Sequence, residues 1–312
     1  MLRRLMLAAA RHERAEHLAR SSAPVRRLVA RYVAGETADD AVRAARGLTA
    51  LGMRIAVDHL GPAGEDTVPG GQEAGVRAYL DLIDRLAAAG LAAGADVSLR
   101  PSALGLGPSG HRAADMTAAA EPVCAAAAAA GATVTLMPEE FTQVEPALEA
   151  LETLRKEHPD VGVAVQAYLR QAEDHCRALA GPGSRVRLTK GAYRAPEALA
   201  YTTSAEVDRS YARCLKILMA GQGHPVIATH DRRLLEIAAA LAVLNEREPG
   251  GFEYQMPYGV RPAEQRRMAA LGAPVRVHVP YGPGWYAHLT RRIAEQPAAL
   301  GLTPVRAPRP RG

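Results

Sequence analysis

"VGVAVQAYLRQAEDHCRALAGPGSRVRLTKG", residues 161–191, contains the pattern that decides the fold. Two β-rich runs, 161–168 and 184–191, are joined by a short segment with helical periodicity, which Gly181 closes. A strand, a helix and a second strand in this order favour parallel strands with a crossover helix between them. The stretch therefore predicts one unit of an α/β fold.

The same unit recurs along the chain. Further β-rich runs lie at 53–60, 95–101, 132–138, 225–231, 252–259 and 275–282. Helical periodicity follows these runs, and left-handed helix caps are expected at Gly90, Gly131, Gly181 and Gly272. Eight units in about 250 residues are typical of a (β/α)8 barrel of the TIM type. A doubly wound open sheet is the alternative, but no GxGxxG fingerprint follows the first run to support it.

The barrel does not account for the whole chain. We assign residues 51–300 to it. Residues 1–50 have the pattern of basic amphipathic helices, which we expect on the flank of the barrel. Residues 301–312 are rich in proline and arginine and are predicted to be disordered.

Composition narrows the class of protein. Of the 312 residues, 48% are hydrophobic and only 4% aromatic, so we expect a large aliphatic core. The net charge of +5 comes from basic residues that share their helices with acidic ones. Because no basic block stands apart, the charge pattern argues against a nucleic-acid partner. Lysines are rare and occur only at Lys156, Lys190 and Lys216.

The cysteines and apolar segments indicate a cytoplasmic protein. The three cysteines form no CxxC pair, which favours a reducing compartment over a zinc site or a disulfide framework; they are Cys124, Cys176 and Cys214. The apolar run before Arg11 is too short for a signal peptide. No apolar stretch approaches the roughly 20 residues of a membrane span.

Polar or charged side chains stand at the ends of the predicted strands. In barrels of this class, the chemistry gathers where the carboxyl ends of the strands meet. The positions are Asp58, Arg100, Met137 with Glu139, Gln166, Arg187 with Lys190, Thr229 with His230, Gln255 with Tyr258, and His278 with Tyr281. None has metal-ligand spacing, and no GxSxG elbow occurs, so we expect neither a metal site nor a serine nucleophile.

The run at 184–191 carries unusual positive charge for a strand. Arg185, Arg187 and Lys190 are interleaved with its apolar residues. Cations at a strand end indicate an anionic ligand, or one that becomes anionic during a reaction. A rim of ion pairs around the barrel is the alternative.

Four motifs resemble the proline dehydrogenase family. They are "VRLTKGAY" at 186–193, "ATHD" at 228–231, "FEYQMPYGV" at 252–260 and "VPYGPGWYAHLTRRIAEQP" at 279–297. The resemblance extends from about Asp58 to Pro297. It implies a distorted (β/α)8 barrel with the final helix over its mouth, and FAD bound without covalent attachment. It also implies hydride transfer from proline to flavin, which gives pyrroline-5-carboxylate, followed by electron transfer to a quinone.

The resemblance also implies the flavin-binding residues. Arg187 corresponds to an arginine beside the reactive edge of the flavin, and Gln166 to a glutamine bonded to the polar edge of the ring. A fixed cation there stabilises the reduced flavin. The residues implied to bind FAD are Pro138, Gln166, Arg187, Lys190, Gly191, Ala192, Thr229, His230 and Gln255.

On the substrate side, the resemblance implies that an arginine pair grips the proline carboxylate. A guanidinium fork suits a carboxylate geometrically. The implied substrate-binding residues are Arg100, Tyr258, His288, Arg291, Arg292 and Glu295, of which Glu295 would orient Arg292. The implied catalytic positions are Arg187, Tyr193 and His278.

The chain departs from the family pattern on the substrate side. The family has lysine at Arg100, aspartate at Met137, tyrosine at His278 and His288, and leucine at Pro257. Methionine cannot replace the hydrogen bonds of an aspartate. Two alternatives to proline oxidation therefore stay open: a modified cyclic imino acid as substrate, or a non-catalytic flavin-binding role. The arginine pair favours an enzyme, and a quinone acceptor would allow at most peripheral contact with a membrane.

Overall fold

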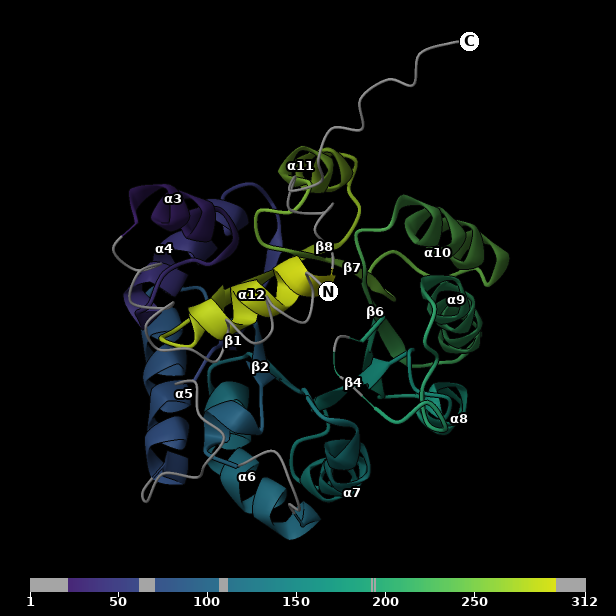
Figure 1. Ribbon diagram of the computed structural model, residues 1–312, viewed down its shortest axis with the longest axis horizontal. Coiled ribbons are helices and arrows are strands. Elements are labelled where there is room, and N and C mark those ends of the chain that lie inside the picture. Colours follow the sequence, from purple (N-terminus) through teal and green to yellow (C-terminus); the bar gives the residue numbers. More distant parts are fainter. Residues whose placement is uncertain (1–21, 62–70, 107–111, 192, 194, 296–312) are drawn as a thin grey trace.

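A computed structural model describes residues 22–61, 71–106, 112–191, 193 and 195–295, and only the backbone at 23, 24, 28 and 291–295. Eight parallel strands close into a barrel in chain order, and β8 pairs back to β1 (Figure 1). The strands are β1 (Arg54–His59), β2 (Asp96–Leu99), β3 (Thr133–Leu136), β4 (Gly162–Gln166), β5 (Arg185–Thr189), β6 (His224–Ala228), β7 (Glu253–Pro257) and β8 (Val275–Tyr281). The predicted (β/α)8 barrel is confirmed.

Helices between the strands form an outer ring (Figure 1). They are α5 (Gly71–Ala88), α6 (Ala113–Ala129), α7 (Val144–Leu154), α8 (Ala172–Ala178), α9 (Ser204–Ala220), α10 (Arg232–Leu244) and α11 (Pro262–Ala270), with short 3-10 turns η1 (Ser102–Leu104) and η2 (Phe141–Gln143). Within the described ranges, no helix combines the length and the apolar character needed to cross a membrane.

Two helices precede the barrel, α3 (Ala23–Tyr32) and α4 (Ala38–Thr49). A capping box between Thr37 and Asp40 starts α4, which satisfies backbone donors at its first turn. Ala41 and Ala45 are fully buried on the α4 face that meets β1, β8 and α5. Residues 1–21 and the tail 301–312 lie outside the described residues.

The hydrophobic core lies between the strands and the helices. Alternate strand residues such as Val97, Leu99, Val186 and Leu188 are buried in this core. Because successive strand side chains point to opposite faces, the residues between them line the barrel interior. Those interior positions are largely polar, and they bond across the barrel rather than packing as an apolar centre.

The interior charges explain the cations of β5. Arg185 lies 3.1 Å from Glu253 and 3.4 Å from Asp96, measured between side-chain nitrogen and oxygen atoms. Arg187 Nη2 lies 2.5 Å from Asp96 Oδ1. Buried guanidinium groups need such partners, because an unpaired buried charge is strongly unfavourable. The anionic partners of these two arginines therefore come from β2 and β7 of the protein itself, as in the ion-pair alternative.

The last described helix, α12 (Trp285–Glu295), crosses the ring of strands at the end where β8 finishes (Figure 1). Leu289 packs in a cluster with Tyr32 and Val260. The Trp285 indole donates a hydrogen bond of 2.8 Å to Glu36. These contacts hold α12 against the N-terminal helices, so the prediction of a final helix over the barrel mouth is confirmed.

Two details of the predicted elements are wrong. The predicted β-rich runs extend past the ends of their strands; the run 95–101, for example, continues two residues beyond Leu99, because Pro101 begins the turn into η1. Gly181 has no positive φ, since α8 already ends at Ala178. The left-handed conformation falls instead on Gly183, with φ 73°, just before β5.

Candidate active site

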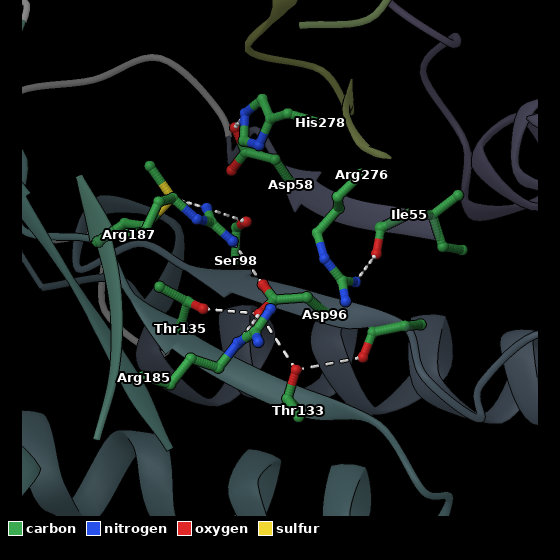
Figure 2. A network of polar contacts seen from close by, with 12 residues as sticks. Ile55, Asp58, Asp96, Ser98, Thr133, Thr135, Arg185, Arg187, Arg276 and His278 are labelled. Carbon is green, nitrogen blue, oxygen red and sulfur yellow. Dashed lines mark hydrogen bonds and ion pairs between the residues drawn. The ribbon is translucent and has the colours of Figure 1, made fainter. Parts of the chain in front are cut away.

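A buried ion-pair network occupies the carboxyl end of the barrel. Asp58 of β1 is fully buried, and both its oxygens pair with Arg100, at 2.6 Å from Nε and 2.6 Å from Nη2. His278 of β8 lies beside the same carboxylate, with 2.9 Å between His278 Nε2 and Asp58 Oδ2 (Figure 2). The bidentate geometry fixes the guanidinium of Arg100 at the mouth.

A second carboxylate completes this network. Arg100 Nη1 donates to Glu139 Oε1 and to the Tyr193 hydroxyl, each at 3.1 Å. The Tyr193 hydroxyl donates to Glu139 Oε1 at 3.2 Å, and the backbone N–H of Ser102 donates to Oε2 at 3.1 Å. The sequence alone does not place Glu139; in the structure it joins the strand ends of β2, β3 and β5 around Arg100.

Arg187 points into the barrel from the middle of β5 (Figure 2). Its side chain is 1% exposed. Besides the ion pair with Asp96, Nη1 donates to Ser98 Oγ at 2.8 Å and contacts Met137 Sδ at 2.8 Å. Its Nε is buried and has no hydrogen-bond partner among the described residues.

Among the residues expected to bind flavin, two glutamines line the interior of the barrel. Gln166 Nε2 donates to the carbonyl of Pro138 at 2.9 Å, which joins the ends of β4 and β3. Gln255 is 4% exposed, and its Oε1 has no partner within the described part of the chain. Buried polar atoms are normally paired, so Gln255 Oε1 and Arg187 Nε have spare bonding capacity for a ligand.

The side chain of Lys190 forms ion pairs with two carboxylates of the protein. Its Nζ lies 2.6 Å from Asp208 Oδ1 and 2.9 Å from Asp231 Oδ2. The Thr229 hydroxyl accepts a hydrogen bond of 3.1 Å from the backbone N–H of Asp231. The motif at 228–231 therefore forms a compact turn after β6. The backbone carbonyl of His230 accepts a hydrogen bond of 2.8 Å from Arg261, which lies between β7 and α11.

The remaining predicted residues lie around α12 and the loop after β5. Tyr258 is partly buried, and its backbone N–H donates to the carbonyl of His278 at 2.9 Å. His288 lies within α12. Ala192 lies outside the described residues, as do the side chains of Arg291, Arg292 and Glu295, whose backbone forms the last turns of α12.

The carboxylates of the barrel interior are held ionised. Burial opposes ionisation of Asp58, but Arg100 and His278 outweigh it and hold the pKa of Asp58 well below its usual value. Burial also acts against Asp96, and Arg187 and Arg185 nevertheless lower the pKa of Asp96. For the described residues, no cluster of three or more His, Cys, Asp or Glu is placed to hold a metal ion.

These shifts predict acid lability. Asp58, Asp96 and Glu253 all have lowered pKa values in the folded protein, so below about pH 5 the unfolded chain binds more protons. The free energy of unfolding should therefore fall as pH falls from about 5 to about 3. Thermal unfolding midpoints measured across this pH range test whether stability falls with falling pH. A midpoint that stays constant or rises as the pH falls would contradict this expectation.

Gly191 turns the chain out of β5, and we expect it to tolerate no side chain. Its φ is +92°, and a Cβ there would lie 2.1 Å from Cδ1 of the buried Tyr168 ring. Gly191→Ala should lower the free energy of unfolding by about 2–4 kcal/mol, from backbone strain and overpacking together. The matched control is Gly272→Ala, where φ is +81° and nothing lies within 4 Å. Equal losses in the two variants by denaturant unfolding would refute the contact with Tyr168.

A cavity of about 660 Å³ lies at the opposite end of the barrel. Its lining includes Arg185 and His224, the first residues of β5 and β6, and Arg247 from the connection between α10 and β7. Arg247 is committed to structure there, since it donates to the carbonyls of Leu218 and Gly221 at 2.7 and 2.6 Å. The amino-terminal face of such barrels serves stability, so we assign the candidate site to the carboxyl end.

Asp96, Glu253 and Arg276, which form ion pairs inside the barrel, are not among the residues that the sequence pattern singles out. Each lies near the start of its strand, not at its carboxyl end. Their alternation with outward Val, Tyr and Met side chains is the signal that marks them as interior residues.

The fold and the site define a TIM-type barrel enzyme with a charged site at the carboxyl ends of its strands. The family model described as proline dehydrogenase matches residues 41–303. The chain belongs to the proline dehydrogenase family and is an oxidoreductase of that family.

Individual relatives agree with this assignment. The chain is 32% identical to proline dehydrogenase of Deinococcus radiodurans over 301 residues, which cover 95% of this chain and 94% of that protein. It is 29% identical to proline dehydrogenase 1 of Bacillus subtilis over 268 residues, 86% of each chain. Proline utilization A from Bdellovibrio bacteriovorus, inactivated by N-propargylglycine, has a similar fold, with a TM-score of 0.77 and 22% identity over 87% of this chain. The chain spans 33% of the length of that larger protein.

Proposed function

We propose that the protein is an FAD-dependent proline dehydrogenase. It transfers a hydride from proline to the flavin, which gives pyrroline-5-carboxylate, and the electrons then pass to a quinone. The observation that carries this proposal is the convergence of Asp58, Arg100, Glu139, Tyr193 and His278 at the carboxyl end of the barrel. The family assignment over the whole barrel supports the same reaction.

The flavin side fits the residues present. Gln255 Oε1 can accept a hydrogen bond and Arg187 Nε can donate one, and the isoalloxazine edge offers both kinds of partner. Bound FAD would supply a two-electron acceptor. The residues proposed to hold it are Pro138, Gln166, Arg187, Lys190, Gly191, Ala192, Thr229, His230 and Gln255.

On the substrate side, two arginines of α12 supply the net positive charge. Arg100 already pairs with Asp58 and Glu139, so it offers hydrogen bonds more than uncompensated charge. Arg291 and Arg292 are therefore proposed to bind the carboxylate, with Glu295 beside them. Tyr258 and His288 are assigned to the wall of the site.

The proline nitrogen must lose a proton during oxidation, and we assign that proton to His278. Its imidazole is fixed by the carboxylate of Asp58 at 2.9 Å. Of the five residues in the mouth network, histidine is the one whose ordinary pKa lies near neutrality. Tyr193, bonded to both Arg100 and Glu139, is held rigidly at the same site.

A modified cyclic imino acid is the second candidate substrate. Met137 places a thioether against Arg187 where the family pattern has an aspartate. A less polar wall favours an N-methylated or larger ring over a ring that carries an added hydroxyl group. Comparing L-proline, hydroxyproline and N-methylproline as reductants of the flavin distinguishes the substrates.

Flavin binding can be tested without turnover. Titrating FAD into the purified protein should quench the flavin fluorescence at a stoichiometry of one per chain. Denaturation should then release unmodified FAD, since no covalent attachment is proposed. Unchanged fluorescence throughout the titration would refute the flavin assignment. The quinone acceptor and a peripheral contact with the membrane are parts of the same proposal, and vesicles containing a quinone would test them.

A further inference from the structure

Arg187 has an unusual source of counter-charge. Within the described part of the chain, the carboxylate that pairs with it is Asp96, at 2.5 Å, from the start of β2. The two residues reach each other across the barrel interior (Figure 2). Because Arg187 is almost wholly buried, this pair determines how much of its charge acts on its surroundings.

Met137 lies on the other side of the same guanidinium. Its Sδ is 2.8 Å from Arg187 Nη1. A thioether is a weak acceptor and carries no charge, so position 137 contributes contact without neutralising the arginine. An acidic side chain at 137 would stand close enough to pair with Arg187 directly.

The structure holds Asp96 firmly in place. Its Oδ2 accepts from Thr135 at 2.7 Å and from Thr133 at 3.1 Å, and Arg185 Nε lies 3.4 Å away (Figure 2). Its Oδ1 is thereby left for Arg187. Two threonines of β3 therefore orient a carboxylate of β2 toward an arginine of β5.

We propose that Asp96 is a positioning residue that supplies the counter-charge of Arg187 and thereby sets the reduction potential of the bound flavin. This inference rests on the proposed flavin-dependent function, because its catalytic consequence is the effect of Arg187 on the flavin. An ionised Asp96 fixes the guanidinium and moderates its positive potential. Loss of that carboxylate exposes the full charge and favours the reduced, negatively charged flavin.

The experiment compares four proteins: the parent, Asp96→Asn, Met137→Asp and the double variant. In Asp96→Asn, we expect reduced flavin to be favoured over oxidised flavin by about tenfold, which raises the two-electron midpoint potential by about 30 mV. The double variant should return toward the parent potential, because the new carboxylate lies on the same guanidinium. Glu236→Gln is the control, since it removes a carboxylate that pairs with Arg232 on the outer helix α10, away from the barrel interior.

Several results would overturn the proposal. They are an unchanged potential in Asp96→Asn, an equal shift in Glu236→Gln, or a double variant no closer to the parent than the single one. If Asp96→Asn fails to fold, recovery of folding in the double variant supports the proposal and continued failure contradicts it.

A second measurement is independent of flavin. A double-mutant cycle on thermal unfolding combines Asp96→Asn with Arg187→Leu in the FAD-free protein. We expect the loss caused by Asp96→Asn to shrink strongly once Arg187 is absent; additive losses would overturn the pairing. A protein that takes up no FAD would refute the proposed function, while this cycle still decides whether Asp96 is the counter-charge.

Discussion

Replacing Glu253 by glutamine is expected to lower the free energy of unfolding by about 3–5 kcal/mol. Glu253 is 1% exposed and binds three arginines. Arg276 donates to its two oxygens at 2.6 and 3.0 Å, Arg185 lies at 3.1 Å, and Arg54 is in direct contact. Glutamine removes the negative charge and turns one acceptor into a donor, which leaves buried guanidinium groups uncompensated.

The control for Glu253 is a glutamate that pairs at the surface. Glu236 pairs with Arg232 on α10, and its side chain is 63% exposed. Glu236→Gln should cost below about 1 kcal/mol. Denaturant unfolding of both variants measures the difference between their free energies of unfolding, provided that the dependence on denaturant concentration is the same in both. Losses within about 0.5 kcal/mol of each other would show that the interior network contributes little.

The second large effect concerns substrate binding. Arg291→Ala and Arg292→Ala should each weaken the binding of L-proline by about 2–5 kcal/mol, because each removes one charged partner of a desolvated carboxylate. FAD binding should stay near the parent value, since neither residue is assigned to the flavin. The expected signature is thus a loss of proline affinity without loss of flavin.

Anaerobic reduction of the bound flavin measures this signature. The proline concentration that gives half-maximal reduction rate is compared among the parent, the two variants and Arg266→Ala. Arg266 is an exposed arginine of α11 and serves as the control for general charge effects. Parent-like proline dependence in both α12 variants would remove their assigned role.

The barrel could be predicted from sequence because its signals are local. Alternation of strand and helix patterns is visible within 161–191 alone, and repetition fixes the closed form. The ends of elements were less predictable. Pro101 turns the chain after Leu99, and Gly183 rather than Gly181 takes the positive φ, because each depends on where the preceding strand or helix stops.

The partners of the charged residues could not be predicted in the same way. Arg187 and Asp96 are 91 positions apart and belong to strands that are not neighbours, so their contact depends on the stagger of the closed barrel. The alternation on β5 shows that Arg185 and Arg187 share the inner face, but it does not identify what faces them. The placement of Glu139 also needs the η2 turn, in which Gln143 Oε1 accepts its backbone N–H at 2.8 Å.

The central claim is that this barrel oxidises proline with a bound flavin. Its most direct test is anaerobic addition of L-proline to the FAD-loaded protein, with the flavin absorbance recorded. We expect the absorbance to bleach, with pyrroline-5-carboxylate formed at one equivalent per reduced flavin, and a quinone to restore the oxidised spectrum. A protein that binds FAD but whose spectrum is unchanged by L-proline would contradict the claim.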